Sequence, residues 1–172
     1  NSIDLRKSIS IVVQHTDKTI STNYKGEIGK NLDVLFHLKN DNGKITGFYF
    51  YKKTGIDIRI IGNVVKNKFL AYELNYKKDT TATLIANINE SSINGKWINA
   101  KTKKEYPLRL IKTPNKTNPL PTNIVGVYYN KICNLTLSIS ISKGEYYYNY
   151  SSDERKLNGK ITFSREEDLY LT

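Results

Sequence analysis

The chain has 172 residues, of which 27 are Lys or Arg and 16 are Asp or Glu, so its formal net charge is +11. The length suits one domain or one and a half, and an apolar fraction of 38% is too high for a disordered chain. A single cysteine excludes an internal disulfide and a Cys-rich zinc site, and because no run of 18 apolar residues occurs, we expect no membrane span.

Alternation of apolar and polar residues dominates the chain, most clearly over 32–38 and 134–142. This pattern is typical of β-strands with one face in a core and one face in water. Turn signals, such as Asn-Asp-Asn-Gly at 40–43, separate the runs at roughly the spacing of a sandwich or a barrel. The predicted strands, in chain order, are 5–13, 24–29, 32–39, 45–52, 56–62, 69–75, 81–89, 93–99, 106–112, 124–129, 133–141, 145–151, 157–163 and 168–171. No segment shows a sustained helical period, so we predict an all-β chain, an antiparallel meander that forms a barrel or a sandwich.

A proline-rich stretch divides the chain, because 113–122 holds three of the four prolines. Proline lacks the backbone donor that a central strand needs, so this segment is expected to be extended and semi-rigid. We interpret it as a linker between a β-barrel or sandwich domain over 1–112 and a smaller β unit over 123–172, and we leave open whether that unit is truncated. A long crossover inside one domain is the alternative.

The two units share short motifs. Each contains a Gly-x-Tyr segment, beginning at Gly47 or Gly126, and each later contains Asn-Gly-Lys, at 94–96 or 158–160. One interpretation is a duplicated β-meander, of which the C-terminal unit is a partial repeat. The other is that strands rich in Tyr and Asn resemble one another through composition alone.

The residue types favour a protein without catalytic activity. His15 and His37 are the only histidines, and no Gly-x-Ser-x-Gly elbow accompanies them. We expect Cys133 to be a small, buried apolar residue at the start of a strand. Glu73 is the best single carboxylate for acid or base chemistry, but we expect it on a solvated strand face. Since no metal-ligand spacing or phosphate-binding glycine loop occurs either, we predict no enzyme, no metal and no cofactor.

The most distinctive local feature is the tyrosine cluster at 146–150, Tyr-Tyr-Tyr-Asn-Tyr. In a strand, Tyr147 faces away from the other three rings, so aromatic side chains cover both faces. Tyrosine outside a core is common at protein interfaces, although cross-strand packing alone also explains it. Tyr147, together with Tyr128, is therefore a candidate contact for a partner.

The net charge indicates which partner to expect. A charge of +11 attracts acidic molecules and speeds their association at low salt. The lysines are spread along the sequence, and the densest group, over 101–104, looks like a hairpin tip. We therefore expect an acidic protein as the partner, do not expect nucleic acid, and leave a small ligand open.

The glycine and aromatic positions from 24 to 112 resemble those of small exported β-meander proteins of bacterial cell envelopes. The matching segments are 26–28, 32–38, 45–51, 58–62, 70–74, 95–97 and 106–110. Some proteins of that group act as immunity or inhibitor proteins that bind an enzyme and block it. The resemblance implies an exported, periplasmic or envelope location, and it makes Trp97 and Arg109 further candidates for partner binding.

These observations lead to one principal functional hypothesis. We expect a non-catalytic exported binding protein, an immunity or inhibitor protein that occludes an acidic toxin or enzyme. Its candidate partner-binding residues are Tyr147, Tyr128, Trp97 and Arg109. The alternative is a lipocalin-like barrel for a small apolar ligand, which requires inward-facing side chains that leave a cavity.

Overall fold

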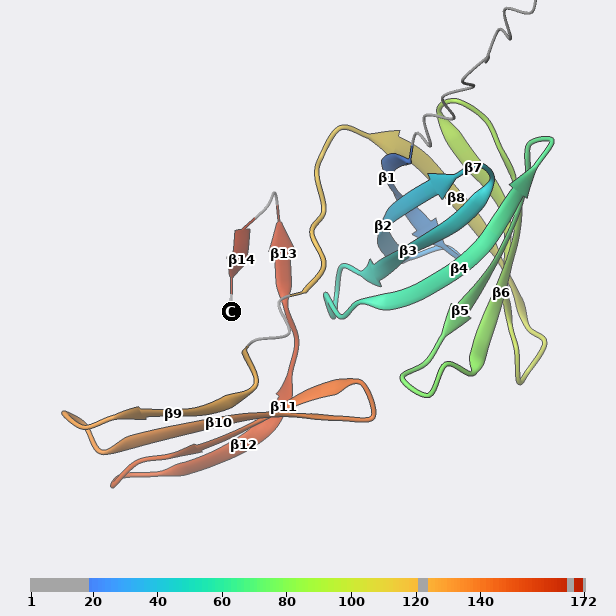
Figure 1. Ribbon diagram of the computed structural model, residues 1–172. Helices are drawn as coiled ribbons and strands as arrows, with labels where there is room; N and C mark the ends of the chain where they lie inside the picture. The colour runs from blue at the N-terminus through green and yellow to red at the C-terminus, as the bar shows by residue number, and fades with distance from the viewer. Residues whose placement is uncertain (1–18, 121–123, 167–168, 172) are drawn as a thin grey trace, which may run out of the picture.

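The computed structural model describes residues 19–120, 124–166 and 169–171, and the strand predicted at 5–13 lies outside them. The chain is all-β, as predicted, and forms a closed barrel followed by a separate four-stranded sheet (Figure 1). Within the described residues, no helix is long and apolar enough to cross a membrane.

Eight antiparallel strands form the barrel, and each strand pairs with the next one along the chain. The strands are β1 (Ile20–Ile28), β2 (Leu32–Asp41), β3 (Lys44–Tyr51), β4 (Ile58–Val65), β5 (Lys68–Leu74), β6 (Thr80–Ile88), β7 (Ser92–Asn99) and β8 (Glu105–Thr113). β1 also pairs with β8, from Asn23 opposite Thr113 to Ile28 opposite Leu108. This pairing closes the sheet, so the N-terminal unit is a barrel and not a sandwich.

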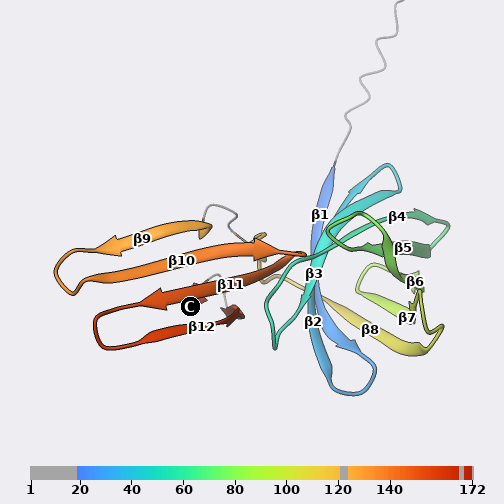
Figure 2. The ribbon, with the colours of Figure 1, turned by 90° about the horizontal axis from the view of Figure 1, so that it is seen from below.

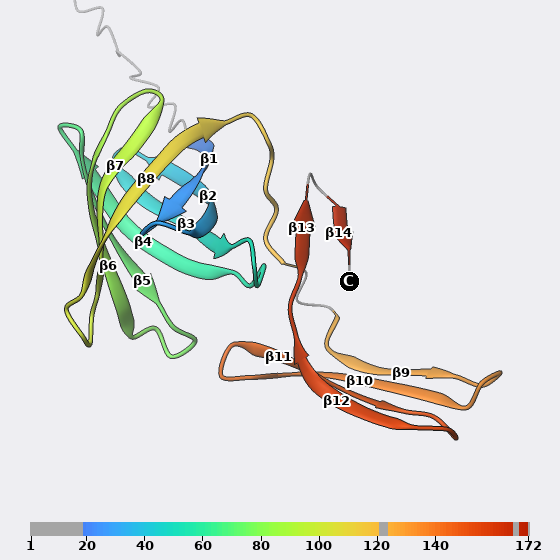
Figure 3. The ribbon, with the colours of Figure 1, turned by 180° about the vertical axis from the view of Figure 1, so that it is seen from behind.

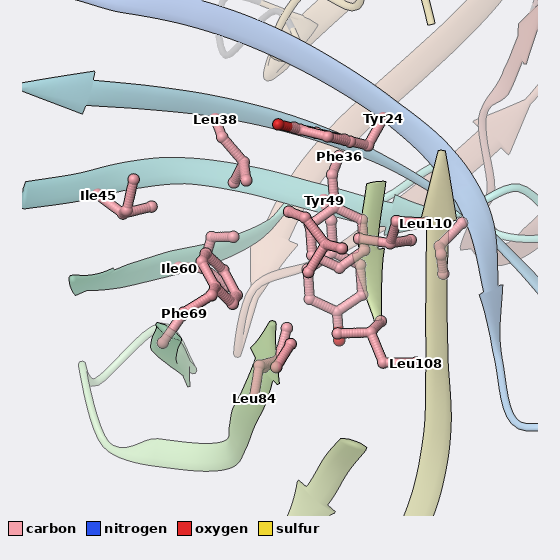
Figure 4. Close-up of a cluster of buried hydrophobic side chains, with 14 of the residues drawn as sticks. Tyr24, Phe36, Leu38, Ile45, Tyr49, Ile60, Phe69, Leu84, Leu108 and Leu110 are labelled. Atoms are coloured by element: carbon pink, nitrogen blue, oxygen red, sulfur yellow. The ribbon is translucent and has the colours of Figure 1, made fainter. Parts of the chain in front are cut away.

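The barrel interior is filled by the apolar side chains of alternate strand positions (Figure 4). The rings of Phe36 and Tyr49 stack at its centre, with centroids 4.4 Å apart and planes 6° from parallel. An eight-stranded barrel is just wide enough for its own side chains to fill it. The buried side chains of this core are Tyr24, Ile28, Val34, Phe36, Leu38, Ile45, Tyr49, Ile60, Phe69, Ala71, Leu84, Ala86, Ile93, Leu108 and Leu110.

The second unit is a four-stranded antiparallel sheet in the order β12-β11-β10-β9. Its strands are β9 (Gly126–Asn130), β10 (Leu135–Ser142), β11 (Glu145–Ser151) and β12 (Lys156–Ile161), and a short hairpin of β13 (Ser164–Glu166) and β14 (Leu169–Leu171) follows. Cys133 is exposed in the turn before β10 and not buried in a strand. The expectation of a buried thiol was wrong because the turn after β9 extends to Asn134.

One face of this second sheet is apolar, and only part of that face is covered. Leu137 pairs with Tyr128 on one side and Tyr150 on the other, while Tyr147 pairs with Ser140 on the opposite face, as the alternation predicts. The covered end of the apolar face packs around Tyr146 and includes Ile56 of the barrel. The rest of the sheet extends away from the barrel (Figure 2).

A buried arginine joins the second unit to the barrel. The side chain of Arg165 is only 5% exposed and forms an ion pair with Asp57. Its Nη1 atom also donates to the carbonyl oxygen of Gly55 at 3.0 Å, and its Cζ lies 3.7 Å from the centroid of the Phe50 ring. The cation comes from the second unit, whereas the carboxylate and the aromatic ring come from the barrel, so these contacts fix the two units against each other.

Candidate binding site at one end of the barrel

Successive turns of an up-and-down barrel alternate between its two ends, so every second turn lies at the same end. The turns at 29–31, 52–57, 75–79 and 100–104 share one end, which we call the basic end. They contain eight lysines and two aspartates, a formal charge of +6. The lysines of the basic end are Lys30, Lys52, Lys53, Lys77, Lys78, Lys101, Lys103 and Lys104.

The opposite end of the barrel has no such charge. Its turns at 42–43, 66–67 and 89–91 contain one lysine and one glutamate, which cancel. The fold therefore brings eight of the 22 lysines, which lie in four turns far apart in the sequence, to one end of the barrel. The spread of the lysines along the sequence does not show this, because it does not reveal which turns share an end of the barrel.

The lysines of the basic end are exposed, and none forms an ion pair with a described residue. Of the two aspartates, Asp57 is already paired with Arg165 of the second unit. Asp79 accepts a hydrogen bond from the side-chain amide of Asn75 at 3.1 Å. The positive charge at this end is consequently available to a binding partner.

The second unit adds a ninth lysine beside this end. The β10–β11 turn approaches the β5–β6 turn (Figures 1 and 3). A Cβ atom placed on Gly144 would lie 3.5 Å from the Cβ of Tyr76, so the two turns lie close together at this point. Lys143, which precedes Gly144, is exposed next to this contact.

Hydrogen bonds hold the β5–β6 turn in one conformation. The side-chain oxygen of Asn75 accepts from the backbone N–H groups of Lys77 and Asp79 at 2.8 and 2.9 Å. The backbone N–H of Lys78 donates to the carbonyl of Asn75 at 2.9 Å, and Lys78 has a φ of 70°. This internal network fixes the direction in which the turn presents its two lysines.

A carboxylate lies inside the barrel at the same end. Glu73 follows Phe69 and Ala71 on the inward face of β5. It accepts hydrogen bonds from the Tyr49 hydroxyl at 2.5 Å and from the indole N–H of Trp97 at 3.0 Å. The expectation that Glu73 faces solvent was wrong, because these two donors on other strands satisfy an inward-facing carboxylate.

A β-bulge supplies the third donor to Glu73. The register shifts so that Glu73 lies opposite Ala82 and Leu74 lies opposite Thr80, which leaves Thr81 as an extra residue in β6. A bulge re-aims a side chain, and here the Thr81 hydroxyl donates to Glu73 at 2.6 Å. Both carboxylate oxygens of Glu73 therefore accept hydrogen bonds.

The surroundings of Glu73 suit a structural role better than proton transfer. Burial, and then the charge of Glu73, raise the pKa of Tyr49 well above its ordinary value, so the phenol keeps its proton and remains a donor. Among the described residues, no group of three or more His, Cys, Asp or Glu side chains could hold a metal ion. Glu73 is therefore a hydrogen-bond acceptor inside the barrel, beneath the lysine-rich turns.

The outer wall beside the basic end carries a hollow of about 400 Å³. Its lining comes from three adjacent strands and the β5–β6 turn: Arg59, Ile61, Tyr72, Leu74, Lys78 and Thr80. Arg59 lies opposite Leu74, and Leu74 lies opposite Thr80, so these three form one row across the wall. The hollow combines two cations with an aromatic and aliphatic floor.

The four residues predicted to bind a partner lie in four different settings. Trp97 lines the barrel interior beside Glu73, and Arg109 lies on the outer wall of β8, paired with Glu27 at 3.1 Å. The Tyr128 hydroxyl donates to the carbonyl of Ile124 at 2.6 Å. Tyr147 is on the opposite face of that sheet from Tyr128, so the structure does not bring these four side chains into one surface.

Sequence reasoning missed the basic end and the hollow. A signal was present, because lysine pairs occur at 52–53, 77–78 and 103–104, in turns that follow β3, β5 and β7. Turns that follow alternate strands of a meander lie at one end of a barrel. Counting charge separately for alternate turns would have identified the basic end.

Comparisons of the chain with protein-family models, with curated proteins and with solved structures gave no significant match.

Proposed function

We propose that this protein binds an acidic partner protein through the basic end of its barrel and acts by occluding that partner. The observation that carries the proposal is the gathering of eight exposed lysines, without ion-pair partners among the described residues, in four turns of one end. The opposite end has no net charge in its turns. The charge therefore gives the molecule one preferred binding end.

Physical chemistry favours a protein ligand of opposite charge at such a surface. A cluster of like charges steers an oppositely charged partner and raises the association rate, most strongly at low salt. Short turns on a closed barrel lose little conformational freedom when a partner binds, and ordering flexible loops is one of the usual costs of association. An immunity or inhibitor protein that covers the acidic cleft of a toxin or enzyme fits this arrangement. The location that we propose for such a protein is outside the cytoplasm, as an exported protein.

The packing of the barrel interior supports a surface function over the binding of a small apolar ligand inside it. The stacked rings of Phe36 and Tyr49 occupy the centre, and both side chains are fully buried. A ligand in the lumen would have to displace these side chains. A protein bound at the basic end leaves the core unchanged.

Charge reversal at the basic end tests the proposal. The test variant carries Lys52→Glu, Lys77→Glu, Lys101→Glu and Lys104→Glu. The matched control carries the same substitution at four exposed lysines outside the basic end, namely Lys39, Lys44, Lys66 and Lys112. Both variants have the same net charge, so only the location of the charge differs.

The two variants and the wild-type protein are immobilised and exposed to extracts of the source cell and of competing cells, at low salt and at about 0.5 M salt. We expect the wild type and the control to retain one and the same acidic protein at both salt concentrations, and the test variant to lose it. Equal retention by both variants would contradict the proposal. Retention of nucleic acid alone, released at the higher salt, would contradict it as well.

A further inference from the structure

Four exposed apolar side chains lie together on the outer wall of the barrel next to the basic end. Ile61, Leu70, Tyr72 and Ile85 are 36%, 37%, 36% and 51% exposed, respectively. Ile61 lies opposite Tyr72, and Leu70 lies opposite Ile85, so the four side chains form two neighbouring rows across β4, β5 and β6. Clustered exposed apolar side chains of this kind mark interaction surfaces more often than isolated ones do.

The hollow described above lies at the end of this apolar strip that is nearest the basic end. Its two cations, Arg59 and Lys78, are exposed, and neither forms an ion pair with a described residue. Lys78 belongs to the turn whose backbone Asn75 holds in place, so the position from which its side chain extends is set before any ligand binds. The Tyr72 ring and the side chains of Ile61 and Leu74 contribute the apolar part of its lining.

This combination points to one class of ligand. A volume of about 400 Å³ accommodates a large side chain with its flanking backbone and lies within the range of small-ligand sites. The floor favours an aromatic or aliphatic group, while the cations at its edge favour carboxylates beside that group. The apolar strip continues from the hollow toward Leu70 and Ile85, so a ligand longer than one residue has further surface to cover.

We propose that the hollow between Arg59 and Lys78 is the specificity subsite of the binding surface and takes an aromatic side chain flanked by carboxylates on the acidic partner. The inference rests on the proposed function and adds the sequence feature that the partner must carry. The lysines of the basic end attract any acidic molecule, whereas the hollow distinguishes an acidic segment with an aromatic residue from one without it.

Two synthetic peptides, Glu-Asp-Phe-Asp-Glu and Glu-Asp-Ala-Asp-Glu, test the subsite by isothermal titration calorimetry with the full chain. Burial of the phenyl group predicts that the phenylalanine peptide binds about tenfold tighter than the alanine peptide. Tyr72→Ala and, independently, Ile61→Thr should reduce that ratio toward one and leave the affinity for the alanine peptide unchanged. Fluorescence of Trp97, the single tryptophan, confirms that each variant is folded.

The charged edge is tested by Arg59→Gln combined with Lys78→Gln, which should weaken binding of both peptides. The matched control combines Lys112→Gln, at an exposed position of β8, with Lys66→Gln, at an exposed turn position of the opposite end that also has a positive φ. This control should bind both peptides as the wild type does.

Each contrary result has a distinct meaning. Equal affinity for the two peptides, or a ratio unchanged by Tyr72→Ala and Ile61→Thr, overturns the subsite and leaves the proposed function to its own charge-reversal test. Equal losses in the Arg59/Lys78 variant and in its control overturn the subsite too. If an oligothymidylate of the same charge binds as tightly as the phenylalanine peptide and loses affinity in the Arg59/Lys78 variant, both the subsite and the proposed protein partner are overturned.

Discussion

Glu73 shows how one carboxylate is tolerated inside an apolar barrel. A charged group that leaves water destabilises the folded state unless its oxygens are hydrogen-bonded. Here Tyr49, Trp97 and Thr81 donate to the two oxygens from three different strands. The carboxylate therefore links β3, β5, β6 and β7 at the basic end of the barrel.

Replacing Glu73 with Ala tests this role. The change leaves the buried Tyr49 hydroxyl and the partly buried Trp97 N–H without their acceptor, and a buried donor without a partner costs about 1–3 kcal/mol. We expect the free energy of unfolding, measured in urea by Trp97 fluorescence, to fall by about 3 kcal/mol. Glu90→Ala, in the exposed β6–β7 turn, is the control and should change it by less than about 0.5 kcal/mol. Equal effects of the two changes would refute a structural role for Glu73.

Tyr49 makes the stability of the barrel sensitive to alkaline pH. Burial, followed by the charge of Glu73, raises the pKa of this phenol in the folded state well above 10.0, its ordinary value. Above pH 10 the unfolded chain therefore loses a proton that the folded chain keeps, and the free energy of unfolding falls as the pH rises. The stabilisation is fully present below pH 10.

We expect wild-type stability to decline more steeply above pH 10 than that of Tyr49→Phe, which has no phenol to titrate at this position. Urea unfolding at a series of pH values on both sides of pH 10 measures the two slopes. Tyr24 and Tyr51, whose pKa values burial also raises, remain in both proteins and act as an internal control. Parallel declines in the two proteins would show that Tyr49 does not titrate as described.

At the scale of the elements, close approach of neighbouring strands requires glycine at an inward-facing position of β3. A Cβ atom at Gly47 would lie 2.0 Å from the carbonyl oxygen of His37 and 3.2 Å from the Cα of Leu38. Both atoms belong to the backbone of β2, so the contact cannot be relieved by a side-chain rotation. Glycines in strands often mark such tight bends in barrels.

Gly47→Ala should therefore destabilise the barrel although it adds a single methyl group. Overpacking of a well-packed interior usually costs about 1–3 kcal/mol, and we expect the upper part of that range because backbone has to move. Thr46→Ala, at the exposed neighbouring position of the same strand, is the matched control and should have a much smaller effect. Thermal unfolding followed by circular dichroism compares them, and a similar Tm for both variants would argue against the steric explanation.

For the whole molecule, Arg165 decides whether the two units behave as one body. Its guanidinium is buried against Asp57 and the Phe50 ring, and removal of one partner from a buried ion pair typically costs about 3–5 kcal/mol. We expect Arg165→Ala to release the second unit from the barrel, with faster proteolysis of the connection between β8 and β9. The free energy of unfolding of the barrel itself, measured in urea by Trp97 fluorescence, should change little.

The control for this prediction is Arg155→Ala. Its guanidinium lies 5.8 Å from the centroid of the Tyr150 ring, far from the barrel contact. Proteolysis of this variant should match the wild type. If both arginine variants are cleaved at the same rate as the wild type, Arg165 does not hold the units together.

Local patterns predicted the strands well and the environments of single polar residues poorly. β11 has the predicted bounds, 145–151, because alternation and the flanking turn residues are properties of adjacent positions. Alternation also allowed Glu73 to face either way, and the donors that decide its direction, on Tyr49 and Trp97, are each 24 residues distant. The hairpin strand β13 was missed because three residues are too few to establish a period.

The candidate site was harder to predict than the strands, because it depends on which distant strands become neighbours. The lysine-rich turns are visible in the sequence, yet their common location follows from the up-and-down order of the strands. The hollow requires that Arg59 of β4 and Thr80 of β6 flank Leu74 of β5 in one row. Neither feature can be derived before the strand neighbours are known.

The sequence by itself determined the all-β class, the strand positions and the residues that share each strand face, because these follow from alternation with period two and from turn residues. Only the tertiary structure decided that β1 closes on β8, that the basic turns share one end, and that Arg165 is buried beside Asp57, 108 positions earlier. Which strands become neighbours is set by the packing of the whole barrel, and no local pattern specifies it.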